Sequence, residues 1–189
     1  MKYLFDQEIE PIFVSSGYFD GQLLGVSGNG VPVDFESLPR LLRVMLTCDG
    51  TLSKAIESAF FEPITIDLLE QVDVESDGRA AKLIRRDINL IGMHSKTRYT
   101  FARSYLDLSV IPENLANELE ETGKGVGWLL RKLNQEQFRE VFTVGWSKDL
   151  PVEEHPKGID LGVYRVYCIK CNGRRFMEIT EHYPIDLYR

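Results

Sequence analysis

The sequence has few cysteines and no long apolar run. Three cysteines, Cys48, Cys168 and Cys171, are too few and too unevenly spread over 189 residues for a disulfide framework. No stretch approaches the roughly 18 consecutive apolar residues of a membrane-spanning helix. The first eleven residues are acidic and contain no apolar segment, so we expect no signal peptide. These absences predict a cytoplasmic, reduced protein that does not bind a membrane.

Positive charge is also in the minority. The chain has 22 Lys and Arg against 29 Asp and Glu, a formal net charge of -7. Proteins that hold nucleic acid or anionic lipid need a basic face, so neither is expected as a partner. Hydrophobic residues make up 43% and charged residues 27%, which is typical of a globular domain. At about 150 residues per domain, we expect one domain over residues 1–189, in which residues 1–36 form an irregular, glycine-rich lead-in.

The hydrophobic periodicity predicts an α+β protein. Helices are expected from Ser37, from Thr51 or Ser53 and from Pro112, and a further helical face at Phe138, Val141 and Phe142. Strands are expected over 64–68, 81–91 and 98–110, and a final hairpin over 162–170 and 174–183. In two places strands follow one another without an intervening helix. This order indicates a single, mostly antiparallel sheet with helices packed on one side.

Three charges fall on apolar strand faces, where every second residue points the same way. Arg86 alternates with Ile84 and Ile88, Arg103 lies among aromatic residues of the next strand, and Glu181 alternates with apolar residues of the last strand. An unpaired buried charge costs several kcal/mol. One interpretation is structural: either arginine pairs with Glu181, or each reaches the sheet edge.

The other interpretation is an enclosed pocket over the sheet. There, Arg86 would bind a carboxylate through two hydrogen bonds, and Glu181 would act as an acid or base. The strand pattern leaves both interpretations open.

Two further motifs carry less weight. Cys168 and Cys171 have the spacing of half a zinc site, but the sequence has no second pair, so we expect buried free thiols and no metal. The segment 123–127 is rich in glycine but lacks the Lys-Ser/Thr ending of a phosphate-binding loop. It is interpreted either as a helix junction or as backbone N–H groups that approach a ligand at a helix start.

Five short segments in this order resemble the chorismate lyase-like superfamily, in particular its mycobacterial-type 4-hydroxybenzoate synthase branch. They span 41–52 with its Gly-Thr-Leu turn, 84–88, 101–104, 125–127 and 179–184. No single segment is specific, and the resemblance depends on their order and spacing between Leu38 and Pro184. Gly125 and Val126 replace the proline and larger apolar residue of the family loop.

The resemblance implies an antiparallel sheet with helical flaps over a buried ligand pocket. It also implies a carbon-oxygen lyase that needs no metal or cofactor and converts chorismate to 4-hydroxybenzoate and pyruvate. Arg86 would bind the ring carboxylate, and Glu181 would transfer the proton or hold the developing hydroxyl. Arg103 would bind the second carboxylate, and Val126 and Gly127 would contact the substrate.

The alternative is a non-catalytic sensor domain of the same fold that binds an aromatic acid. A lyase or hydrolase acting on a related substrate and a purely structural protein are the further alternatives, because a fold does not determine chemistry. The sequence gives no oligomeric state.

Overall fold

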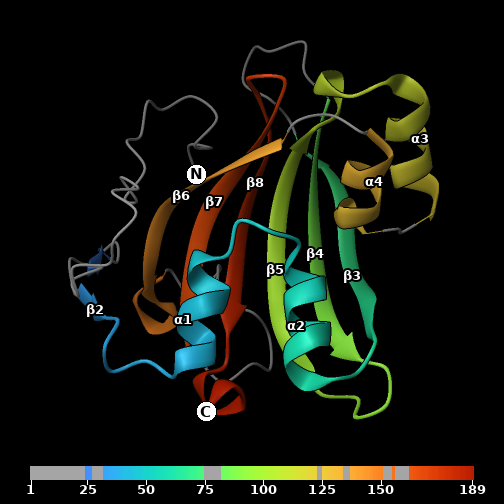
Figure 1. The fold of residues 1–189 in the computed structure, drawn as a ribbon. Helices are drawn as coiled ribbons and strands as arrows, with labels where there is room; N and C mark the ends of the chain where they lie inside the picture. The colour runs from blue at the N-terminus through green and yellow to red at the C-terminus, as the bar shows by residue number, and fades with distance from the viewer. Residues whose placement is uncertain are drawn as a thin grey trace.

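Six antiparallel strands form the frame of the molecule (Figure 1). The computed structural model describes residues 24–26, 32–74, 82–122, 125–133, 137–150, 155 and 162–189. The main strands are β3 (Ile64–Val74), β4 (Leu83–Gly92), β5 (Arg98–Asp107), β6 (Gln137–Trp146), β7 (Val163–Cys171) and β8 (Arg174–Tyr183), and they lie in the order β3-β4-β5-β8-β7-β6. The predicted α+β class with an antiparallel sheet is confirmed.

The α-helices lie on one side of this sheet (Figure 1). They are α1 (Arg40–Thr47), α2 (Leu52–Phe60), α3 (Glu113–Thr122) and α4 (Val126–Leu133). Short 3-10 helices are η2 (Leu108–Val110), η3 (Ser147–Asp149) and η5 (Ile185–Tyr188). Among the described residues, none of the helices has both the length and the apolar character that crossing a membrane takes.

Two apolar clusters lie between the helices and the sheet. One packs α3 and α4 against β5, β7 and β8 through residues such as Leu119 and Leu129. The other packs α1, α2 and η5 against the opposite end of the sheet through residues such as Leu42 and Ile56. Ile88 and Val141 pack against both clusters, so the middle of the sheet lies between two cores.

The lead-in is more regular than expected where the structure describes it. β1 (Leu24–Val26) and β2 (Pro32–Asp34) form a two-stranded antiparallel sheet, and Val33 and Phe35 are buried in the cluster under α1. The rest of the predicted irregular segment, residues 1–23 and 27–31, lies outside the described residues.

The helical face predicted at Phe138, Val141 and Phe142 is wrong, because these residues belong to strand β6. The pairing with β7 shifts between Val141 and Thr143, so Phe142 is an extra residue in a β-bulge. A bulge shifts the strand's alternation by one residue. The apolar positions on both sides of it then imitate the three- and four-residue spacing of a helix.

Glu62 fastens the β4–β5 hairpin to the connection between α2 and β3. Its carboxylate accepts hydrogen bonds from the backbone N–H groups of His94 and Ser95 at 3.1 Å each, from the Ser95 hydroxyl at 2.7 Å and from the Tyr99 hydroxyl at 2.5 Å. The hydrogen bonds from Tyr99 and Ser95 lower the pKa of Glu62 to about 2. The folded state therefore favours the ionised carboxylate.

We expect acid to remove this contribution to stability. A carboxylate whose pKa is lowered on folding stabilises the protein above its unfolded pKa of about 4.5, and the effect is lost as pH falls towards about 2. Thermal unfolding of the wild type and Glu62→Gln, measured from pH 7 to pH 2, should show a Tm difference that shrinks below pH 4.5. Asp73→Asn, at an exposed position of β3, is the control. A Tm difference for Glu62→Gln that does not change with pH would contradict this role.

Candidate functional site

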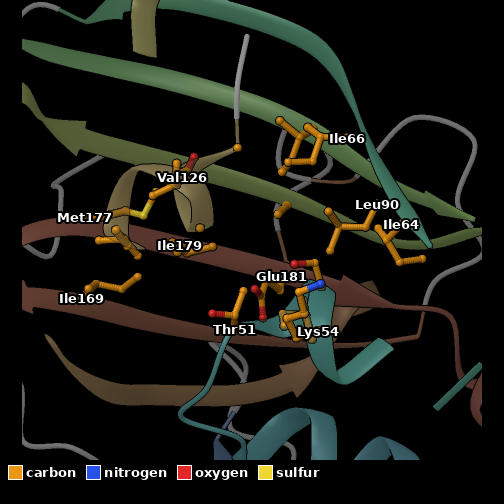
Figure 2. A pocket seen from close by; sticks show the side chains of 18 of the residues that line it. Thr51, Lys54, Ile64, Ile66, Leu90, Val126, Ile169, Met177, Ile179 and Glu181 are labelled. Atoms are coloured by element: carbon orange, nitrogen blue, oxygen red, sulfur yellow. The ribbon is translucent and has the colours of Figure 1, made fainter. Parts of the chain in front are cut away.

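A cavity of about 240 Å³ lies on the helical side of the sheet, in the middle between the two apolar clusters. All six strands of the main sheet contribute to it, and α2 and the start of α4 cover it. Figure 2 shows labelled side chains from β3, β4, β7, β8, α2 and α4 around one space. An apolar cavity of about 150 Å³ can hold benzene. The volume here therefore suits one substituted ring.

Arg86 enters this cavity from β4. Its side chain is 1% exposed, and it lies beside Ile88 and Leu90 on the cavity face of the strand. It has an interaction partner in the chain, while its Nε and Nη2 are buried atoms that no hydrogen bond uses. Burial lowers the pKa of Arg86 to about 10, so the side chain remains positively charged at neutral pH.

Glu181 enters the cavity from β8, where three donors hold its carboxylate. Oε2 accepts from Arg165 Nε at 2.7 Å and from the Tyr183 hydroxyl at 2.5 Å, and Oε1 accepts from the Tyr167 hydroxyl at 2.8 Å. Glu181 is 3% exposed. A carboxylate has about four acceptor positions. These contacts fill both positions on Oε2 and leave one on Oε1.

Arg165 compensates the charge of Glu181. It is 1% exposed, and its guanidinium lies over the Tyr167 ring at 4.6 Å from the ring centre. Its Nη1 also donates to the carbonyl oxygens of Leu46 at 3.2 Å and Cys48 at 2.9 Å. Burial acts to lower the pKa of Arg165, but the charges of Glu181, Tyr183 and Tyr167 and the hydrogen bond to Glu181 together outweigh burial and raise it. The cation is therefore held between the sheet and the end of α1.

The strand pairing separates Arg86 from Glu181. Arg86 pairs with Ser104, which pairs with Ile179, whereas Glu181 pairs with Ala102, two residues away from Ser104 on β5. Two strand spacings and two residues along a strand put the backbones of Arg86 and Glu181 about 12 Å apart. Their side chains thus enter one cavity from different sides, with room for a ligand between them.

Two glycines bring α4 close to the opposite wall. A Cβ on Gly125 would meet Ile66 Cδ1 of β3 at 2.1 Å, and a Cβ on Gly127 would meet Thr51 Cγ2 at 3.2 Å. The lack of side chains at these positions lets α4 lie against both β3 and the start of α2. Gly125, Val126 and Gly127 all line the cavity, which places the predicted contact residues Val126 and Gly127 there.

The prediction that Arg103 shares this cavity is wrong. Arg86 pairs with Ser104, so Ser104 rather than Arg103 lies on the cavity face of β5. Arg103 lies on the other face, where Nε and Nη2 donate to the two carboxylate oxygens of Asp87 at 2.9 and 2.8 Å. Both faces of β5 are largely buried. Alternation of apolar residues therefore could not identify the face towards the helices.

The sequence patterns did not identify Arg165 and Tyr167 as residues of the site. The Asn172-Gly173 turn predicts the hairpin, but an uninterrupted hairpin would pair Arg165 with Thr180. The pairing shifts by one residue between Ile169 and Lys170, which makes Phe176 an extra residue in β8 and brings Arg165 opposite Glu181. A charged residue between Val163 and Tyr167 was the available signal.

Cys168 and Cys171 lie on opposite faces of β7 as free thiols. Cys168 donates to Glu140 at 3.6 Å, and burial raises its pKa to about 12. Among the described residues, no group of three or more His, Cys, Asp or Glu side chains is arranged to hold a metal ion.

Comparisons with known proteins identify similar sequences and folds. A family model described as "Chorismate pyruvate-lyase Rv2949c-like" matches residues 46–189. The chorismate pyruvate-lyase of Mycobacterium leprae is 26% identical over 168 residues, which cover 82% of this chain and 80% of the relative.

Solved structures of other proteins are also similar to this chain. PhnF from Mycobacterium smegmatis has a TM-score of 0.50 at 12% identity, over 74% of this chain and 66% of that chain. A GntR-family regulator from Bacillus cereus has a TM-score of 0.45 at 14% identity, over 67% of this chain and 94% of that chain. At these identities, the likeness to PhnF concerns the fold alone.

The buried pair of Arg165 and Glu181 generates a stability prediction. Removal of one partner from a buried ion pair leaves an uncompensated charge and costs about 3–5 kcal/mol. We therefore expect Arg165→Met to lower the free energy of unfolding in urea by that amount. Glu181→Gln combined with Arg165→Met should recover part of the loss, because neither charge then remains.

Lys170→Met is the control for this measurement. Lys170 pairs with Glu140 at 2.5 Å, but its side chain is 27% exposed. Such a pair contributes about 1 kcal/mol or less. Equal losses for Arg165→Met and Lys170→Met would contradict the structural importance of the buried pair.

Proposed function

The chain belongs to the chorismate pyruvate-lyase Rv2949c-like family, and we propose that it eliminates pyruvate from chorismate to give 4-hydroxybenzoate. The M. leprae relative has the name of that activity. The observation that carries the proposal is that a buried arginine, Arg86, and a buried carboxylate, Glu181, enter one covered cavity of single-ring size from different sides.

The reaction depends more on binding of the substrate and exclusion of water than on a strong acid or base. The C3–O bond of chorismate breaks, C4 loses a proton, and the ring becomes aromatic. The released enolpyruvate takes up one proton and becomes pyruvate, so the atoms of the substrate equal those of the two products. Formation of the aromatic ring provides the driving force. The protein contributes by holding the substrate in a reactive orientation and keeping water out.

Arg86 binds the ring carboxylate in this proposal. Its guanidinium is positively charged and buried, and it lines the cavity. Charge-assisted hydrogen bonds between an arginine and a carboxylate are frequently bidentate, which fixes orientation as well as adding affinity. Ile88 and Leu90 on the same strand face the ring.

Glu181 accepts a hydrogen bond from the C4 hydroxyl group through the remaining position on Oε1. Tyr167, Tyr183 and Arg165 orient the carboxylate, and the arginine compensates its charge. This arrangement favours the role of hydroxyl acceptor over that of proton shuttle, because three donors already hold the group in place. Val126 and Gly127 at the start of α4 cover the ring.

The proposal predicts turnover of chorismate by the purified protein, followed by the ultraviolet absorbance of 4-hydroxybenzoate. Arg86→Ala removes charge-assisted hydrogen bonds worth about 1.5–3 kcal/mol each, so kcat/KM should fall by about 100-fold. Glu181→Gln should lower kcat, because the amide replaces an acceptor that the ion pair orients. Arg85→Ala is the matched control, since Arg85 is the preceding residue of β4 but points to the other face and pairs with Glu70.

Two results would count against the proposal. Turnover that Arg86→Ala and Arg85→Ala reduce equally would place the chemistry outside this cavity. Binding of chorismate or 4-hydroxybenzoate without any product, analysed by mass spectrometry, would favour the alternative of a sensor domain.

A further inference from the structure

The cavity carries more positive charge than one carboxylate needs. Among the described residues that line it, four side chains are cationic, Lys54, Arg86, Arg131 and Arg139, and two are carboxylates, Glu57 and Glu181. The lining therefore has a surplus of two positive charges. A cavity with this surplus suits a ligand with two negative charges.

Two of the cations lie at the rim and share one acidic partner. Lys54 binds Glu57 at 2.5 Å, and its side chain is 65% exposed. Arg131 is also exposed. The hydrogen bond from Lys54 lowers the pKa of Glu57, and the charge of Arg131 contributes to the same shift. Water and Glu57 therefore compensate both of these cations.

Arg139 differs from the rim cations because it is half-buried on β6. Its Nη1 donates to the carbonyl oxygen of Asp49. Its Nε is a buried atom without a hydrogen-bond partner in the described part of the chain. The hydrogen bond of Nη1 thus orients the Arg139 guanidinium, and the buried Nε–H group is available to donate to a ligand. A buried donor of this kind calls for a partner.

Arg139 also lies across the cavity from Arg86. It pairs with Ile169 of β7, and Ile169 lines the cavity. Strands β5, β8 and β7 separate β4 from β6. Four strand spacings of about 4.8 Å lie between the two backbones, and both long side chains reach inward from these ends. A ligand between them can contact one arginine at each end.

We infer that Arg139 binds the second carboxylate of a dicarboxylate substrate, a role that rests on the proposed function. In chorismate this carboxylate belongs to the enolpyruvyl group, which departs as pyruvate. The aromatic product keeps only the ring carboxylate, so it retains the contact with Arg86 and loses the contact with Arg139. Arg139 therefore makes the site favour the substrate over 4-hydroxybenzoate.

The test compares two ligands by isothermal titration calorimetry. One is 4-hydroxybenzoate, and the other is 3-(carboxymethoxy)-4-hydroxybenzoate, a stable aromatic analogue with a second carboxylate. Arg139→Gln should weaken binding of the dicarboxylate by about tenfold or more and leave the affinity for 4-hydroxybenzoate within about twofold. Arg139→Lys, which keeps the charge, should restore part of the loss. Lys170→Gln, which removes a positive charge that is paired with Glu140 outside the cavity, is the control.

The outcomes separate this inference from the proposed function. Equal weakening of both ligands by Arg139→Gln, or no weakening of the dicarboxylate, would overturn the role of Arg139 and leave the proposed function standing. A wild-type protein that binds neither ligand would overturn both. Circular dichroism of each variant establishes that a loss of affinity does not come from unfolding.

Discussion

The ion pair between Arg165 and Glu181 is the interaction on which the site depends. Arg165 binds the Glu181 carboxylate through Nε and the carbonyl oxygens of Leu46 and Cys48 through Nη1. One guanidinium therefore fixes the acidic group of the sheet and also the end of α1, just before α2 begins. A buried carboxylate is costly unless it is paired and hydrogen-bonded. The contacts that compensate this cost also hold β8, which carries Glu181, to the end of α1.

Apolar packing surrounds this polar centre from two sides. One cluster holds α3 and α4 to the sheet, the other holds α1 and α2, and the cavity lies where the two meet. The low polarity of the clusters strengthens the field of the buried arginines inside the cavity. The net charge of -7 is a property of the whole chain. It does not describe the cavity, whose described lining has a surplus of positive side chains.

Sequence periodicity predicted the fold class and the inward direction of Arg86 and Glu181, because β4 and the end of β8 alternate without interruption. The periodicity gave wrong predictions where the alternation of apolar residues does not identify the face towards the helices or is interrupted by a bulge. Both faces of β5 are largely buried, which placed Arg103 on the wrong side. The bulge at Phe176 brings Arg165 opposite Glu181, and no local pattern marks the position of this extra residue. The bulge in β6 likewise disguised a strand as a helix.

The central claim is that one cavity holds an aromatic acid between a buried arginine and a buried carboxylate. A crystal structure of the protein with 4-hydroxybenzoate tests it most directly. The account predicts the ring carboxylate within hydrogen-bond distance of Arg86 and the hydroxyl group at Oε1 of Glu181, with the ring under α4. A ligand bound outside the cavity, or one with its hydroxyl group at Arg86 and its carboxylate at Glu181, would contradict the account.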